Sequence, residues 1–448
     1  MAQLIALVSL NAPSAQSEIE ELTLLLAIAL ATALAARALR FPYTLALAVV
    51  GLLLGFAPLP NPGIFDPDIA LFVFLPILLF EGAWNVDVRK LLADWPLVLL
   101  LAAPGLLVAV GIAALGLHWG AGLPWLVAVD VGAIISPTDP IAVIALMRQL
   151  GMSSRLRTII EGESLFNDGM GAATFTIALN LLAVTLAPNY HGFTGAQIAQ
   201  EIGGALWLFV GGVLIGAVAG WLVSRLLRLI EDRLIETSIT FIVAYGVYLL
   251  ADLAHASGIL AVVVAGLILG SYGRKIGISR DAHEAVNTVW EFLSYVATSL
   301  LFLLLGIQLS RVTSAGIAAI IWATISVIVG RAVLVYGATE LNNALAAWAR
   351  RRGTRWTPVR PVFAPRAWPP ILLLSGLRGA LSIVLALSLP ASTPYLAEVR
   401  DAIYGVVLVT LLGQGVALRF LLPHWPGVQA ASHGEDEDEA EEEQAAPA

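Results

Sequence analysis

Residues 134–143 read Ile-Ile-Ser-Pro-Thr-Asp-Pro-Ile-Ala-Val, and residues 161–171 read Glu-Gly-Glu-Ser-Leu-Phe-Asn-Asp-Gly-Met-Gly. Each stretch places carboxylates inside a long apolar segment. The prolines at 137 and 140 remove amide donors and break regular helix, so Thr138 and Asp139 are expected in non-helical backbone. Inside a membrane such backbone is tolerated only where protein buries it or where it lines a cavity. The two stretches therefore predict a polar site within a membrane protein.

Composition supports a membrane protein. Of 448 residues, 59% are hydrophobic and 12% are charged, and the mean hydropathy is +0.87. A soluble domain carries about 25% charged residues, so the composition argues against a soluble enzyme and against a nucleic-acid-binding protein. The net charge of −8 equals the eight acids within residues 435–443, and the rest of the chain is balanced. There is no cysteine, which excludes disulfides and thiol chemistry.

The hydrophobic segments predict an all-α polytopic membrane protein. A helix needs roughly 20 mostly apolar residues to cross the hydrocarbon core of a bilayer. We predict thirteen transmembrane helices, at residues 22–38, 43–57, 69–86, 95–117, 123–147, 158–186, 202–229, 235–253, 258–272, 286–310, 315–347, 369–390 and 402–422.

The basic residues supply an independent test, because cytoplasmic loops collect Lys and Arg. The connections after odd-numbered segments hold 20 of the 24 basic residues, and those after even-numbered segments hold only Arg311 and Arg400. This alternation predicts an extracytoplasmic N-terminus and a cytoplasmic C-terminus. The remaining two basic residues, Arg331 and Arg378, fall within apolar segments, where ionisable groups are functional candidates.

Two carboxylates lie near the predicted mid-membrane plane. Asp168 follows Arg157 by 11 residues, or about 16 Å of helix, and Asp139 precedes Arg148 by about 13 Å. Spacings of four residues place Glu163 with Asn167, and Ser164 with Asp168, on shared helix faces. Glu81 and Glu291 lie nearer the ends of their segments, which is typical of interfacial residues.

The order of the segments predicts an inverted repeat. Gly376 and Gly379 are expected to loosen the twelfth segment as the prolines break the fifth, and these two segments are seven apart. A repeat with that odd offset pairs six helices with six in opposite orientation, which is typical of secondary transporters. Oxygen ligands suit a hard cation, and low dielectric disfavours a charged carboxylate, so a buried one can hold a proton or a cation. The site predicts cation/proton exchange.

The sequence resembles the cation/proton antiporter-1 family, which contains the NhaP-type sodium/proton antiporters and the eukaryotic sodium/proton exchangers. The resemblance covers about residues 20–422 and is carried by residues 136–140, 162–169 and 376–380. It implies that Asp168 binds a proton and a cation in alternation. It also implies a Na⁺ site at Asp168, Ser164 and Thr138.

The same resemblance implies further roles. Glu163 would lie in the site, held by an arginine, for which Arg331 is favoured over Arg378. Asp139 and Arg378 would sit where the two broken helices cross. Asn167 stands where the electrogenic branch has a second aspartate, which implies electroneutral one-for-one exchange. A purely structural role stays the alternative for Asp139 and for the ion pair of Glu163.

The resemblance also implies a homodimer built from two kinds of domain. The expected parts are an N-terminal extracytoplasmic segment at 1–21, a core domain at about 95–186 and 315–422, a dimerisation part at about 22–86 and 235–310, a linker helix at 202–229 and an acidic cytoplasmic tail at 423–448. We expect a prokaryotic plasma-membrane protein that works with the bilayer, monovalent cations and protons, and with neither cofactor nor nucleic acid.

Two alternatives stay open from the sequence. The first is a K⁺/H⁺, or mixed K⁺ and Na⁺, antiporter of the same mechanism, because ion selectivity depends on small differences in cavity geometry. The second is a passive cation channel, which would carry net current where electroneutral exchange carries none.

Overall fold

The computed structural model describes residues 15–39, 42–57, 70–140, 143–144, 147, 152–186, 192, 194–310, 312–313, 316–352 and 363–421. Within these ranges the fold is all-helical and contains no β-strand. Each of the thirteen predicted segments coincides with helical structure. Eight described helices are long and apolar enough to cross a membrane on their own, and the number of crossings and the inverted repeat stay predictions.

The described part of the first half of the chain contains mostly short helices and the π-helical turns η2 and η3. Its helices are α2 (Ala15–Ala38), α3 (Tyr43–Gly55), η2 (Ala70–Phe74), α5 (Leu75–Asn85), α6 (Val88–Ala93), α7 (Trp95–Leu100), η3 (Leu101–Gly105), α8 (Leu106–Ala121), α9 (Trp125–Ile135) and α11 (Ser154–Thr185). The predicted segment 95–117 contains a π-helical turn, η3, around Pro104, because proline cannot donate the regular helical hydrogen bond.

The second half contains the two longest helices of the described residues, α12 and α17. Its helices are α12 (Gly195–Leu227), α13 (Arg233–Leu253), α14 (Gly258–Ile268), η4 (Leu269–Gly273), α15 (Arg274–Ile276), α16 (Arg280–Leu309), α17 (Gly316–Arg352), α18 (Trp368–Leu374), α19 (Ala380–Leu387) and α20 (Leu396–Leu421). Polar side chains cap several helix starts and satisfy amide groups there; Ser153, Asp232, Ser257 and Ser279 each accept such a bond.

Both predicted helix breaks are confirmed. Helix α9 ends at Ile135, and residues 136–140 are non-helical. Helices α18 and α19 are separated by residues 375–379, which contain both of the glycines named above.

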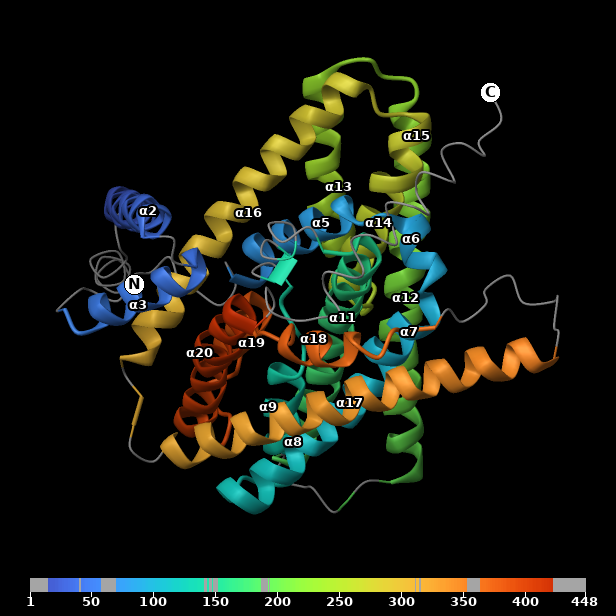
Figure 1. Ribbon diagram of the computed structural model, residues 1–448. Helices are drawn as coiled ribbons and strands as arrows, with labels where there is room; N and C mark the ends of the chain where they lie inside the picture. Colours follow the sequence, from blue (N-terminus) through green and yellow to red (C-terminus); the bar gives the residue numbers. More distant parts are fainter. Residues whose placement is uncertain are drawn as a thin grey trace, which may run out of the picture.

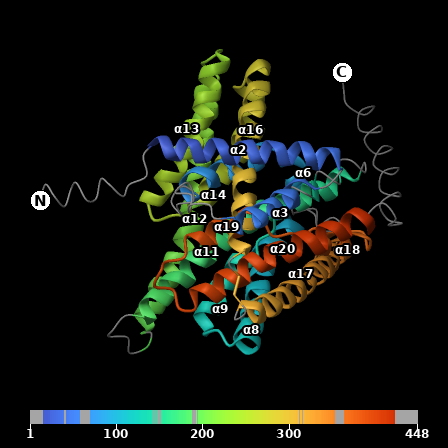
Figure 2. The same ribbon diagram turned by 90° about the vertical axis from the view of Figure 1, so that its left-hand side faces the viewer.

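The helices pack in two groups. In the first, α9 contacts α8, α11, α19 and α20, and α17 packs along α8 and α20. In the second, α3 packs along α16, and α14 contacts α5, α12 and α13. Figure 1 shows α17, α8 and α9 together on one side and α13 and α14 on the other, and Figure 2 shows α17 beside α20.

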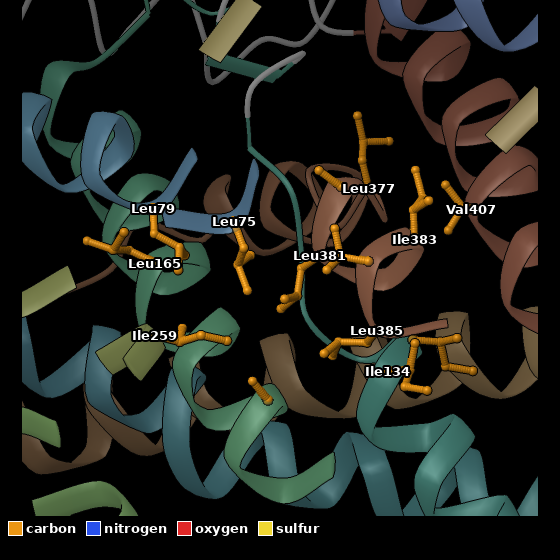
Figure 3. Packing of buried hydrophobic residues seen from close by; sticks show 14 of the residues in the cluster. Leu75, Leu79, Ile134, Leu165, Ile259, Leu377, Leu381, Ile383, Leu385 and Val407 are labelled. Carbon is orange, nitrogen blue, oxygen red and sulfur yellow. The ribbon is translucent and has the colours of Figure 1, made fainter. Parts of the chain in front are cut away.

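Between the groups lies an apolar cluster. Buried side chains from both groups contribute to it, including Leu75, Leu165, Ile259, Leu381 and Leu385 (Figure 3). The groups also contact one another through α11 with α5 and α14, and through α16 with α19 and α20. These contacts place the two helix breaks close to the boundary between the groups.

Candidate functional site

The two broken segments cross and bond to each other through their backbones. The Asp139 amide donates to the Leu377 carbonyl oxygen at 2.8 Å. One turn away, the Ser382 hydroxyl donates to the Ile134 carbonyl oxygen at 2.7 Å. Interrupted helix leaves carbonyl and amide groups without partners, and here each segment supplies partners to the other.

Charged side chains occupy the ends of the broken helices. The Asp139 Oδ2 accepts from the Ala380 amide at 3.4 Å, where α19 begins, so a negative charge faces the positive end of that helix. Arg378 is 1% exposed and donates through Nε to the Ile135 carbonyl at 2.5 Å, where α9 ends, and through Nη1 to the Gly376 carbonyl. The positions predicted for Asp139 and Arg378 at the crossing are therefore observed.

Glu163 forms a buried ion pair with Arg331. The Arg331 Nη2 lies 3.0 Å from Glu163 Oε2, Nη1 also donates to Oε1, and neither residue is more than 2% exposed. Arg331 also donates to the Leu372 carbonyl near the end of α18, at 3.2 and 2.8 Å. Of the two arginines weighed for this partnership, Arg331 is the one that bonds Glu163.

Asn167 belongs to the same cluster. Its Nδ2 donates to Glu163 Oε1 at 3.2 Å, as the four-residue spacing predicts. The side chain is 1% exposed, and its Oδ1 is buried with no partner among the described residues. Glu163 is thus neutralised by one arginine and bonded by one amide, so the cluster of Glu163, Asn167 and Arg331 carries no net charge.

Asp168 differs from Asp139 and Glu163. It is only partly buried, and within the described part of the chain no side chain or amide donates to it. One turn before it, the Ser164 hydroxyl lies 3.0 Å from the Thr138 hydroxyl, which comes from the non-helical stretch after α9. Asp168, Ser164 and Thr138 all line one cavity, so a carboxylate and two hydroxyl oxygens face a common space.

The cavity has a volume of about 540 Å³. One wall comes from the crossing and α11. The facing wall comes from α3 and α16, where Tyr43 stacks on Tyr295 with ring centroids 5.2 Å apart. Glu81, Glu161 and Glu291 line it toward the ends of α5, α11 and α16 that adjoin the basic connections.

Sequence reasoning missed part of this wall. Glu81 and Glu291 were expected at the membrane interface, and both line the cavity. Tyr43 and Tyr295 were not singled out, because an isolated ring in an apolar helix carries no local signal. Within the described residues, no three His, Cys, Asp or Glu side chains form a metal-binding cluster. The predicted Na⁺ site uses two hydroxyls and one carboxylate, so that finding does not bear on it.

Comparison with known proteins gives consistent results. A family model described as "Sodium/hydrogen exchanger, transmembrane" matches residues 24–424. The Na(+)/H(+) antiporter ApNhaP of Aphanothece halophytica is 34% identical over 412 residues, which cover 91% of this chain and 75% of that protein. The Na(+)/H(+) antiporter NhaH of Halobacillus dabanensis is 32% identical over 420 residues, covering 90% and 96%.

A solved structure shares the fold. The sodium proton antiporter MjNhaP1 from Methanocaldococcus jannaschii, determined at pH 8, superposes with a TM-score of 0.70. The alignment covers 91% of this chain and 98% of the other, at 20% sequence identity.

Proposed function

The chain belongs to the sodium/hydrogen exchanger family, and on that basis we propose that it is a Na⁺/H⁺ antiporter in which Asp168 binds either ion. One observation carries the assignment. Of Asp139, Glu163 and Asp168, only Asp168 faces the cavity without a bonded partner among the described residues, while Glu163 is paired and Asp139 caps a helix. The named relatives are antiporters, and we propose that this chain is likewise a transporter and not an enzyme.

Cation and proton compete for the same oxygens in this proposal. A Na⁺ ion bound at Asp168 takes ligands from the Ser164 and Thr138 hydroxyls, which already lie 3.0 Å apart. A proton on Asp168 neutralises the carboxylate and removes the charge that attracts the cation. Either occupant cancels a charge that is costly to carry through the membrane interior, so only the loaded transporter changes conformation.

The charge arrangement supports electroneutral exchange. Glu163 and Arg331 cancel, and Asn167 adds no charge. With Asp139 held at the start of α19, Asp168 is the group whose charge varies with ion binding, and one proton is exchanged for one Na⁺.

The cavity supports an inward-facing conformation. Its three glutamates lie toward the helix ends that adjoin the basic connections, which the distribution of Lys and Arg assigns to the cytoplasm. We place thirteen crossings in the plasma membrane, with the N-terminus outside and the C-terminus inside. "Outer" and "inner" are used below in this sense.

The packing groups support alternating access. Residues 95–186 and 315–422 move as a core against residues 22–86 and 235–310, with α12 as linker, in a homodimer. The crossing lies wholly within the first group, and the Tyr43–Tyr295 wall belongs to the second, so relative movement opens or closes the cavity between them.

Proteoliposomes with an imposed pH gradient test the proposal. Addition of Na⁺ is expected to dissipate the gradient in wild type, and Asp168→Ala is expected to abolish this response. Asp252→Asn, a substitution of an exposed carboxylate on α13, is the matched control and is expected to exchange normally. Retained exchange by Asp168→Ala would contradict the proposed role.

The same vesicles separate the alternatives. Parallel runs with Li⁺ and K⁺ determine ion selectivity, and a K⁺ response as large as that to Na⁺ would favour the K⁺(Na⁺)/H⁺ antiporter. A passive cation channel would carry net current with a reversal potential set by the cation gradient, whereas electroneutral exchange carries none.

A further inference from the structure

We infer that Asp130, in the outer part of α9, is a second proton-binding residue: it carries a proton in the inward-facing conformation and releases it to the outer solution when the transporter opens outward. This inference rests on the proposed antiport function and adds to it a control of the cycle by outside pH. It concerns a carboxylate that the exchange mechanism above does not use.

The surroundings of Asp130 require a neutral side chain. The residue is 1% exposed, and both carboxylate oxygens are buried with no hydrogen-bond partner among the described residues. An ionised carboxylate without partners in an apolar interior is so costly that the group takes up a proton instead. Glu163, by contrast, is equally buried but has an arginine and an amide as partners.

No ionisable neighbour relieves this cost. Helix α9 packs against α8, α11, α19 and α20. In the described residues, α19 has no ionisable side chain and α8 has only His118. Helix α11 has Asp168 and the charged residues before it. The first turns of α20 have four ionisable side chains: Glu398, Arg400, Asp401 and Tyr404.

His118, Arg400 and Asp401 have partners elsewhere, and the buried Tyr404 hydroxyl has no hydrogen-bond partner among the described residues. His118 Nδ1 bonds to the Leu123 carbonyl at 2.7 Å. Arg400 donates to the Ala386 carbonyl at the end of α19 at 3.3 Å, and Asp401 accepts from the Thr313 hydroxyl at 2.8 Å. The proton on Asp130 is therefore not replaced by a salt bridge within the described residues.

Helix geometry places Asp130 on the face of α9 that packs toward α19. Asp130 and Ile134 are four residues apart on α9 and share one face. Figure 3 shows the Ile134 side chain near Leu385 of α19, and the Ile134 carbonyl accepts from the Ser382 hydroxyl of the same helix. Asp130 lies six residues, or about 9 Å, outward of Ser136, where α9 has ended and the cavity-lining residues Pro137 and Thr138 follow.

An apolar layer separates Asp130 from the cavity. Leu75 and Leu381 line the cavity, and Leu385 lies one turn further outward on α19. Figure 3 shows these side chains in one cluster with Ile134 and with Ile259 of α14. Because α14 and α5 belong to the second helix group, movement of the first group past them opens this layer and admits water to Asp130.

The expected consequence is a linkage between outside pH and conformation. A proton bound in the inward-facing state and lost in the outward-facing state changes the ratio of the two by up to about tenfold per pH unit. Outside acid therefore favours the inward-facing state. This effect adds to direct competition between protons and Na⁺ at Asp168.

Two variants test the inference. The first test follows the rate of Na⁺ exchange in right-side-out vesicles at fixed inside pH as the outside pH is lowered. The rate is expected to decline less steeply in Asp130→Asn than in wild type, and the two declines are expected to differ by up to about tenfold per pH unit. The chain has no cysteine, so Asp130→Cys is a unique label site. A membrane-impermeant thiol reagent is expected to modify it from outside, with a rate that depends on outside Na⁺.

Ala128→Cys is the matched control. Ala128 is buried and lies one turn from Gly132, on the face of α9 opposite Asp130. That face packs on α8, because a Cβ on Gly132 would lie 2.9 Å from the Val110 carbonyl. The cysteine at position 128 is therefore expected to stay unmodified. Absence of labelling at Asp130→Cys, or an outside-pH profile of Asp130→Asn equal to that of wild type, would each overturn the inference. In either case normal wild-type exchange leaves the antiport proposal standing, whereas failure of wild type to exchange refutes that proposal itself.

Discussion

Glu163→Gln tests whether the buried ion pair holds the core together. The substitution keeps the side-chain shape but leaves the Arg331 guanidinium, which is 2% exposed, with no negative partner in the pair. Breaking one side of a buried pair costs about 3–5 kcal/mol. Since unfolding free energies are typically about 5–15 kcal/mol, this loss is a large share of the total.

The opposite substitution has an additional effect. Arg331→Gln leaves Glu163 charged with only the Asn167 amide as partner, and it removes two hydrogen bonds to the Leu372 carbonyl. That carbonyl keeps one bond from the Ser375 hydroxyl at 2.9 Å. We therefore expect Arg331→Gln to be at least as destabilising as Glu163→Gln, and the double variant to recover more than half of the loss because no unpaired charge remains.

Thermal unfolding in detergent micelles measures these differences. The midpoint shift per kcal/mol falls with chain length and is about 2–4 °C for domains of 150–250 residues, so each single variant of this longer chain is expected to lower the midpoint by a few degrees. Asp94→Asn serves as control: it breaks the Arg155–Asp94 pair, whose Arg155 side chain is 27% exposed, so water compensates part of the loss. Additive effects of the two single substitutions, or a smaller shift than that of the control, would refute the reasoning.

Four further outcomes are expected. Thr138→Val is expected to raise the apparent KM for Na⁺ by about 2–13-fold, the equivalent of one hydrogen bond, in fluorescence assays of exchange; an unchanged KM would remove Thr138 from the cation ligands. Gly379→Ala is expected to abolish exchange, because a Cβ would lie 1.8 Å from Asp139 Oδ2 and force the crossing apart; full activity in the same assay would contradict this geometry. Asn167→Asp, which adds a second carboxylate beside Asp168, is expected to make transport generate current on a supported membrane, and a current no larger than that of wild type would count against the charge argument. Lowering pH on both sides is expected to raise the apparent KM for Na⁺ as protons occupy Asp168; rates undiminished in acid would exclude competition at one carboxylate.

The helix breaks were predictable because their cause is local. Pro137, Pro140, Gly376 and Gly379 are visible in the sequence, and so are charges inside apolar segments. The helix ends were less predictable: α16 begins at Arg280, not at 286, because its first turn is polar and a Ser279 cap fixes its start. A hydropathy pattern does not predict where a helix with a polar first turn begins.

The contacts across the site depend on the tertiary fold. Glu163 and Arg331 are 168 residues apart, and only the family resemblance favoured this pairing over Arg378. The bond from Arg378 to the Ile135 carbonyl at the end of α9 depends on how the two broken segments cross, which no local sequence pattern predicts. The stacked rings of Tyr43 and Tyr295 likewise meet only because α3 runs along α16.

The Tyr43–Tyr295 pair belongs to a different helix group from the proposed ion ligands. The oxygens proposed to bind the ion lie on one helix group, while these two rings, on the other group, line the same cavity. The residues that bind the ion and the residues that shape the cavity entrance can therefore be changed separately. An engineer could widen or narrow the entry by changing α3 and α16 while leaving every ion ligand intact, and evolution has the same freedom to retune throughput without rebuilding the binding site.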